Sequence, residues 1–112
     1  MMTDCLFCKI LAGEVPSEKV YEDEHLFAFK DIYPKAPYHV LIIPKKHIAT
    51  LNDLGDEDTE LAGRMMQAAK HLAKEAGFAD DGYRVVMNCG EGGGQIIFHM
   101  HLHLMGGRTF KA

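Results

Sequence analysis

Three histidines occupy alternate positions in the stretch FHMHLHLMG, residues 98–106. They are His99, His101 and His103. Alternate side chains of a strand point to one face, so the three imidazoles should share a face. The residues between them, Met100, Leu102 and Leu104, should then pack into the core. A solvent-facing strand normally mixes several polar residue types, so an all-histidine face indicates a common chemical task.

Two kinds of chemistry fit such a row. Neighbouring histidines can share one zinc ion, but the backbones of His99 and His103 should lie about 13 Å apart, too far for one tetrahedral ion to take all three easily. The alternative gives the residues separate roles in one pocket. Crowded imidazoles resist protonation, which favours a neutral, nucleophilic His101 near pH 7. Its neighbours can then donate hydrogen bonds to the anion that it attacks.

A glycine-rich loop precedes this strand. The stretch NCGEGGGQ, residues 88–95, brings four glycines together between two predicted strands. Either it is a flexible hairpin loop or its backbone N–H groups approach a phosphate. It is not a dinucleotide-binding fingerprint or a P-loop, because a strand follows it and no Gly-Lys-Ser/Thr is present.

The elements that must position these residues indicate an α+β domain spanning residues 1–112. Helices are predicted over 6–12 and 57–76, the second with Gly77 as its C-cap. Strands are predicted within 19–31, on both sides of a turn at 22–24, and over 39–44, 83–89 and the histidine segment. Two successive strands at the end favour an antiparallel sheet covered by a helix.

Composition narrows the class of protein. The formal net charge is −4, and Lys45-Lys46 is the only local basic pair, which argues against a nucleic-acid binder. No apolar run reaches the length of a membrane span, and MMTDC lacks a signal-peptide pattern. These features predict a cytoplasmic protein with no membrane partner. In that setting the Cys-x-x-Cys pair of CLFC suggests metal binding or redox chemistry before a structural disulfide.

Several stretches together resemble the histidine triad family. HMHLHLM resembles its His-x-His-x-His motif, and DIYPKAPYHVLIIPKKHI and GYRVVMNCGEGGGQIIFHMHLHLMGGR resemble its other segments, over about residues 4–108. The sequence is most similar to the nucleotide-binding branch of the family. This resemblance implies a five-stranded antiparallel sheet with one long helix and a short N-terminal helix. It also implies a homodimer that hydrolyses adenosine phosphoramidates.

The resemblance also implies roles for single residues. His101 would attack the α-phosphorus and form a nucleotidyl-histidine, His103 would contact the phosphate, and His39 would orient the nucleophile. Asp31 would accept hydrogen bonds from the ribose hydroxyls. The phosphate region would be lined by Asn88 and by the backbone around Gly94 and Gln95. The apolar slot for the base would be formed by Leu6, Phe7, Ile10, Phe29 and Ile32.

Two features extend or qualify this resemblance. Some bacterial members bind structural zinc, and the matching residues here are Cys5, Cys8, His47 and His99. A Cys₂His₂ set leaves no open position, so such a zinc would be structural and the chemistry would need no metal. Ile96 stands where many members have a serine that can assist the leaving group, which bears on leaving-group preference and rate.

Other functions remain open from the sequence. A zinc-dependent hydrolase would use the histidines as metal ligands. A dinucleoside polyphosphate hydrolase would offer the same pocket a different leaving group. A nucleotide-binding module without turnover would act through a partner.

Overall fold

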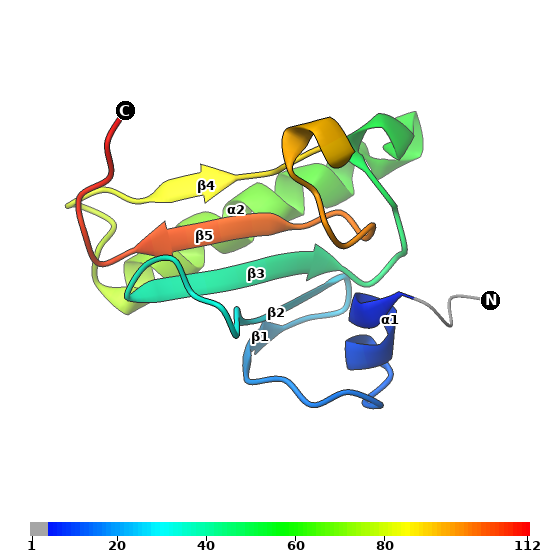
Figure 1. Cartoon of the computed structure of the whole chain (residues 1–112), viewed down its shortest axis with the longest axis horizontal. Coiled ribbons are helices and arrows are strands. Elements are labelled where there is room, and N and C mark those ends of the chain that lie inside the picture. The colour runs from blue at the N-terminus through cyan, green and yellow to red at the C-terminus, as the bar shows by residue number, and fades with distance from the viewer. Residues whose placement is uncertain (1–4) are drawn as a thin grey trace.

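A five-stranded antiparallel sheet forms the centre of the computed structural model, which describes residues 5–112 (Figure 1). The strands are β1 (Lys19–Glu22), β2 (Leu26–Lys30), β3 (Tyr38–Pro44), β4 (Arg84–Val86) and β5 (Leu102–Gly106). Their order is β1-β2-β3-β5-β4, so β3 is central, as expected for its β-branched run. The helices are α1 (Leu6–Leu11) and α2 (Thr59–Ala76), with short 3₁₀ turns η1 (Leu51–Asp53), η2 (Asp56–Asp58) and η3 (Glu91–Gly93).

The two faces of the sheet carry different layers. Helix α2 crosses one face and packs on alternate strand residues such as Ala28, Val40, Ile42 and Leu104 (Figure 1). Helix α1 packs on the other face, with Phe7 against a cluster that includes Phe29 and Leu41. The predicted α+β fold is therefore confirmed. Within residues 5–112 no helix is long and apolar enough to cross a membrane.

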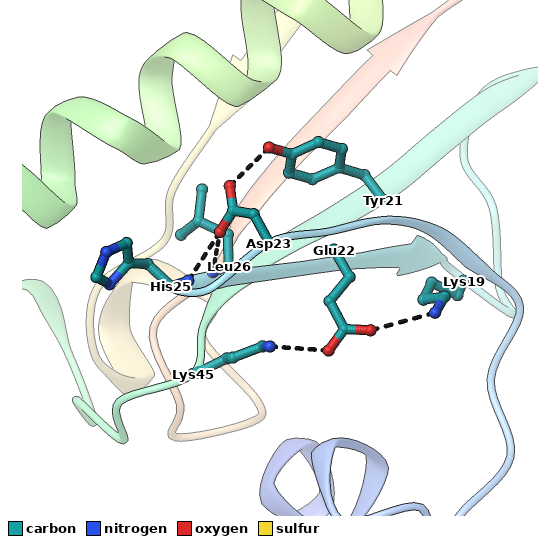
Figure 2. A network of polar contacts seen from close by, with 7 residues as sticks. All are labelled: Lys19, Tyr21, Glu22, Asp23, His25, Leu26 and Lys45. Carbon is teal, nitrogen blue, oxygen red and sulfur yellow. Dashed lines mark hydrogen bonds and ion pairs between the residues drawn. The ribbon is translucent and has the colours of Figure 1, made fainter.

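Local sequence explains where the elements begin and end. Gly77 adopts the left-handed conformation, φ 90°, and caps α2 as predicted. The turn between β1 and β2 is built by Asp23, whose Oδ1 accepts the N–H groups of His25 and Leu26 at 2.8 Å (Figure 2). Tyr21 donates its hydroxyl to Asp23 Oδ2 at 2.6 Å on the same turn.

Ionic contacts join this hairpin to the end of the next strand. Figure 2 shows Glu22 between Lys19, at 3.2 Å, and Lys45, at 2.8 Å. Lys45 directly follows β3, so the pair links the β1–β2 turn to the start of the chain segment that carries His47. Exposed ion pairs of this kind contribute little stability each.

The last two predicted strands are shorter than the sequence suggested. Strand β5 begins at Leu102, so the expectation of a regular strand through His99 and His101 is wrong at its start. The N–H of Met100 donates instead to the Ile48 carbonyl at 2.7 Å, which draws this segment away from the ladder. Strand β4 ends at Val86, paired with His103, because β5 offers no regular partner beyond that point.

Candidate functional site

Strand periodicity brings the expected catalytic residues to the face that α1 covers. In β3, Val40 and Ile42 pack toward α2, so His39 points to the opposite face. In β5, Leu102 and Leu104 pack toward α2, so His103 joins His39 there. The His101 ring lies 5.0 Å from the His103 ring and 5.1 Å from that of Phe7, between centroids. The common face predicted for the triad is thus retained, although only His103 lies in a regular strand.

The His101 imidazole is held in one tautomer. Its Nδ1 lies 2.7 Å from the main-chain carbonyl oxygen of His99. A carbonyl only accepts, so Nδ1 carries the proton and donates, which leaves Nε2 unprotonated. Burial lowers the pKa of His101, whose side chain is buried, and so keeps the ring neutral near pH 7. A neutral imidazole with an unprotonated Nε2 is a competent nucleophile.

A hydrogen-bonded relay sets the tautomer of His103. The main-chain N–H of Lys35 donates to His39 Nδ1 at 3.1 Å, so the proton of the neutral His39 ring lies on Nε2. His39 Nε2 then donates to His103 Nδ1 at 2.9 Å, with Asp31 Oδ2 3.4 Å away. His103 Nδ1 accepts, and its Nε2 therefore carries a proton that can be donated to an anion.

Burial is the first cause that keeps these rings neutral, ahead of the mutual repulsion expected from the sequence. It lowers the pKa of His103 to about 4, with smaller contributions from His101 and His39. It also lowers the pKa of His39, against the opposing attraction of Asp31. The crowding of imidazoles contributes, but the apolar surroundings contribute more.

The residues expected to bind the base divide into covered and exposed groups. Phe7, Ile10 and Phe29 are 3–9% exposed and pack together, with the Phe7 and Phe29 ring centroids 5.4 Å apart. Leu6 is 40% exposed and Ile32 is 80% exposed. Asp31, at the end of β2, keeps its carboxylate 18% exposed and accepts the Tyr33 N–H at 2.8 Å. The three buried side chains therefore support the site from the core side. Leu6 and Ile32 offer apolar surface to a ligand.

The glycine loop is an ordered turn held by Gln95. The Gln95 amide nitrogen donates to the carbonyls of Ala49 and Ile97, and its oxygen accepts the Gly90 N–H at 2.8 Å. The N–H groups of Gly94 and Gln95 donate within the same turn. Gly94 is exposed in the left-handed conformation, φ 90°, and Asn88 is half-buried. Ile96 projects its side chain outward, 85% exposed.

Cys5, Cys8, His47 and His99 converge, although up to 94 positions separate them in sequence. His99 Nδ1 lies 3.2 Å from His47 Nδ1, 3.4 Å from Cys5 Sγ and 3.6 Å from Cys8 Sγ, and Cys8 Sγ lies 3.3 Å from His47 Nδ1. A tetrahedral zinc with ordinary bond lengths would require about 3.4 Å between nitrogens and about 3.6 Å between sulfur and nitrogen. These four distances therefore match a tetrahedral zinc site to within a few tenths of an ångström, and all four ligand atoms lie within 4.8 Å of one another.

A second group of residues of the kinds that bind metals consists of Asp31, His39 and His103. The two groups differ in which ring nitrogen of their histidines carries the proton. His99 Nε2 donates to the Pro44 carbonyl at 2.7 Å, which leaves Nδ1 unprotonated and aimed at the two cysteines. His39 has the opposite arrangement, because its Nδ1 accepts a backbone N–H and its Nε2 must keep the proton. The Cys₂His₂ cluster thus fits a cation, and the Asp31 group fits a hydrogen-bonded relay.

The main-chain partners of the histidines carry no signal in the sequence. Three tautomers are fixed by the Lys35 N–H, the His99 carbonyl and the Pro44 carbonyl. Any residue could supply the carbonyls, and any residue except proline could supply the N–H. Pro34 and Pro37 mark the segment around Lys35 as a loop. That signal locates the segment but not the hydrogen bond to His39.

Comparisons with known proteins agree with this geometry. The family model of the HIT domain matches residues 12–110. The Escherichia coli protein named purine nucleoside phosphoramidase is 46% identical over 108 residues, covering 96% of this chain and 91% of that protein. The crystal structure of a HIT family hydrolase from Legionella pneumophila shows a TM-score of 0.94 and 54% identity over 96% of each chain. A histidine triad protein from Clostridium difficile gives a TM-score of 0.93 and 45% identity, over 97% of this chain and 95% of that one.

Proposed function

Because the chain belongs to the HIT domain family, we propose that it is a hydrolase that cleaves the P–N bond of purine nucleoside phosphoramidates. The relative named purine nucleoside phosphoramidase supports the reaction and the substrate class. One observation carries the chemistry. The Nδ1–H of His101 donates to the His99 carbonyl, and this leaves Nε2 unprotonated for attack on phosphorus.

In the first step, His101 Nε2 attacks the α-phosphorus and the bond from phosphorus to the leaving nitrogen breaks. The electron pair of that bond goes to the nitrogen, which takes a proton and departs as an amine. Ile96 carries no acidic proton, so solvent supplies it. Positive charge develops on the His101 ring and strengthens the hydrogen bond from Nδ1 to the His99 carbonyl. His103 Nε2–H donates to a phosphoryl oxygen as negative charge gathers there.

In the second step, water attacks the phosphorus of nucleotidyl-His101. The bond between phosphorus and Nε2 breaks, its electron pair returns to the imidazole, and the nucleoside monophosphate leaves. The water loses one proton to solvent. The His39–His103 relay keeps its tautomer through both steps, because the main-chain N–H of Lys35 remains in place.

Substrate recognition is assigned to residues around the relay. Asp31 would accept hydrogen bonds from the ribose hydroxyls through its partly exposed carboxylate, and Leu6 and Ile32 would contact the base over the buried Phe7. Asn88 and the turn at Gly94 and Gln95 would border the phosphate. Adenosine is the favoured nucleoside. The homodimer, the cytoplasmic location and the single domain over 1–112 are further parts of this proposal.

The Cys₂His₂ cluster is assigned to a structural zinc ion. When bound, zinc would hold Cys5, the N-cap of α1, and Cys8 within α1 against His47 and His99. Four protein ligands leave no position for substrate or water, so the cluster supports the fold and the reaction runs on the imidazoles. Without a cation, burial and the adjacent Cys5 raise the pKa of Cys8 to about 11, so zinc uptake should release protons.

The first experiment is mass spectrometry of the protein mixed with an adenosine phosphoramidate and quenched without acid. Wild type should gain the mass of one nucleotidyl group, and His101→Ala should not. His71→Ala is the matched control, because this exposed histidine lies on α2 and pairs only with Glu75 among the described ion pairs. An adduct on His101→Ala, or turnover by it at the wild-type rate, would contradict the assignment of the nucleophile.

The same assay separates the other functions. A diadenosine polyphosphate offered in parallel tests the alternative leaving group at the same pocket. Binding of adenosine monophosphate without adduct or turnover would favour a nucleotide-binding module. Loss of turnover on chelation, with the fold intact, would favour a zinc-dependent hydrolase.

A further inference from the structure

A short segment after β5, residues 107–111, lies against the loop that carries Lys35. A Cβ placed on Gly107 would lie 3.0 Å from Pro37 Cβ, so the backbone of Gly107 packs closely against the Pro37 ring. The Arg108 guanidinium donates from Nη2 to the Lys35 carbonyl at 3.2 Å. Two positions of the same loop are therefore held by residues that follow the last strand.

Arg108 is itself held by an aromatic ring. Two guanidinium groups lie over the Phe110 ring, with Arg108 Cζ 4.3 Å and Arg84 Cζ 4.8 Å from its centroid. Arg84 belongs to β4 and also donates to the Lys111 carbonyl. Arg108 Nη1 donates to the Thr109 carbonyl at 3.2 Å. These contacts fix the segment to the edge strand and aim Arg108 at the loop.

Lys35 links the contacts of Arg108 to the candidate site. Its carbonyl accepts from Arg108 and its N–H donates to His39 Nδ1, so the two peptide groups on either side of one Cα carry both contacts. Pro34 and Pro37 limit the rotation of the loop around it. A change in the orientation of Lys35 would therefore alter the hydrogen bond that places the His39 proton on Nε2.

We propose that Arg108, held by Phe110 and Arg84, is a positioning residue that fixes the His39–His103 relay through the backbone of Lys35. Arg108 does not touch the reacting atoms in this role. It favours the tautomer in which His103 presents Nε2–H to the phosphate. The effect on turnover rests on the proposed function, whereas the effect on the His39 tautomer does not.

The test is long-range ¹H–¹⁵N NMR of the histidine side chains, which distinguishes protonated from unprotonated ring nitrogens. Wild type should show His39 with Nε2 protonated and Nδ1 unprotonated. Arg108→Ala and Phe110→Ala should shift His39 toward a mixture of tautomers. Arg108→Lys should restore part of the wild-type spectrum, and Phe110→Tyr should keep all of it, because the ring remains. Arg64→Ala is the matched control, since that exposed arginine pairs with Glu60 on α2.

Turnover gives the second reading. Loss of one exposed, charge-assisted hydrogen bond should lower kcat by about two- to tenfold in Arg108→Ala, with little change in KM. A His39 tautomer identical to wild type in both alanine variants would overturn the proposal, even if kcat fell. A shifted tautomer in a protein that does not hydrolyse phosphoramidates would leave the proposal standing and refute the proposed function.

Discussion

Replacing Cys8 by serine removes one of the two thiolates from the Cys₂His₂ cluster and should lower the melting temperature of the zinc-loaded protein. Cys8 Sγ lies 3.3 Å from His47 Nδ1 and 3.6 Å from His99 Nδ1. This thiolate therefore joins α1 to two segments that are distant in the sequence. A serine hydroxyl is a poor zinc ligand, and the variant should lose most of its affinity for the ion.

The expected fall in melting temperature follows from the linkage between zinc binding and folding. A ligand at 100 times its dissociation constant stabilises the native state by about 2.7 kcal/mol. In a domain of about 100 residues, each kcal/mol moves the melting temperature by about 4–8 °C, which gives a fall of about 10–20 °C. Phe7 and Ile10 remain buried, and each contributes about 1.5–3 kcal/mol by burial, so α1 should stay docked and the variant should still fold.

The assay is thermal unfolding followed by circular dichroism, with zinc content measured on the same samples. Cys89→Ser is the matched control, because Cys89 is also a half-buried free cysteine but lies outside the cluster. A chelator should bring wild type to the melting temperature of Cys8→Ser and leave the variant unchanged. The reasoning would be refuted if both Cys8→Ser and chelator-treated wild type melted within about 2 °C of untreated wild type.

Other variants test the pocket and its supports. The folded pKa of His103 is about 4, below its unfolded value, so the unfolded chain binds more protons between about pH 6.5 and 4. Stability should fall as pH falls through that window, and urea unfolding should show a shallower fall in His103→Gln. Gln95→Ala leaves the Gly90 N–H without its acceptor and should cost about 1–3 kcal/mol in the same assay, with a stability equal to wild type as the contrary result. Gly106→Ala places a Cβ 2.6 Å from the Phe78 ring and should lower the melting temperature. Ile96→Ser should raise kcat for phosphoramidates whose amine is a poor leaving group. An unchanged ratio of kcat between substrates with good and with poor leaving groups would contradict this.

Sequence patterns predicted the fold well where one physical rule dominates. Period-two patterning placed Leu102 and Leu104 in the core, and Gly77 marked the end of α2. The family resemblance grouped Cys5 and Cys8 with two distant histidines, and the structure brings the four together. These patterns reflect side-chain burial and backbone conformation, and both can be inferred from the type of a single residue.

Main-chain contacts between distant segments could not be predicted. Met100 donates its N–H to the Ile48 carbonyl, and regular pairing in β5 starts only at Leu102; nothing in either residue type signals this contact. The Lys35 N–H sets the His39 tautomer without any contribution from the lysine side chain. Burial, and not only crowding, lowers the pKa of His103, because that pKa depends on packing by elements far away in sequence.

The position of the Cys₂His₂ cluster leads us to expect a particular order of folding and metal binding. Cys8 and His99 are 91 positions apart, and α1 contributes no strand, so their meeting closes a loop that contains most of the sheet. Closing such a loop costs about 4 kcal/mol in chain entropy beyond a constant term, and a sheet that has already folded meets this cost before the ion binds. Tight zinc uptake should therefore follow sheet formation, and a stopped-flow experiment with a zinc indicator should show uptake lagging the far-ultraviolet signal. During synthesis Cys5 and Cys8 are made long before His99, so an ion held by all four residues would bind to a nearly complete domain.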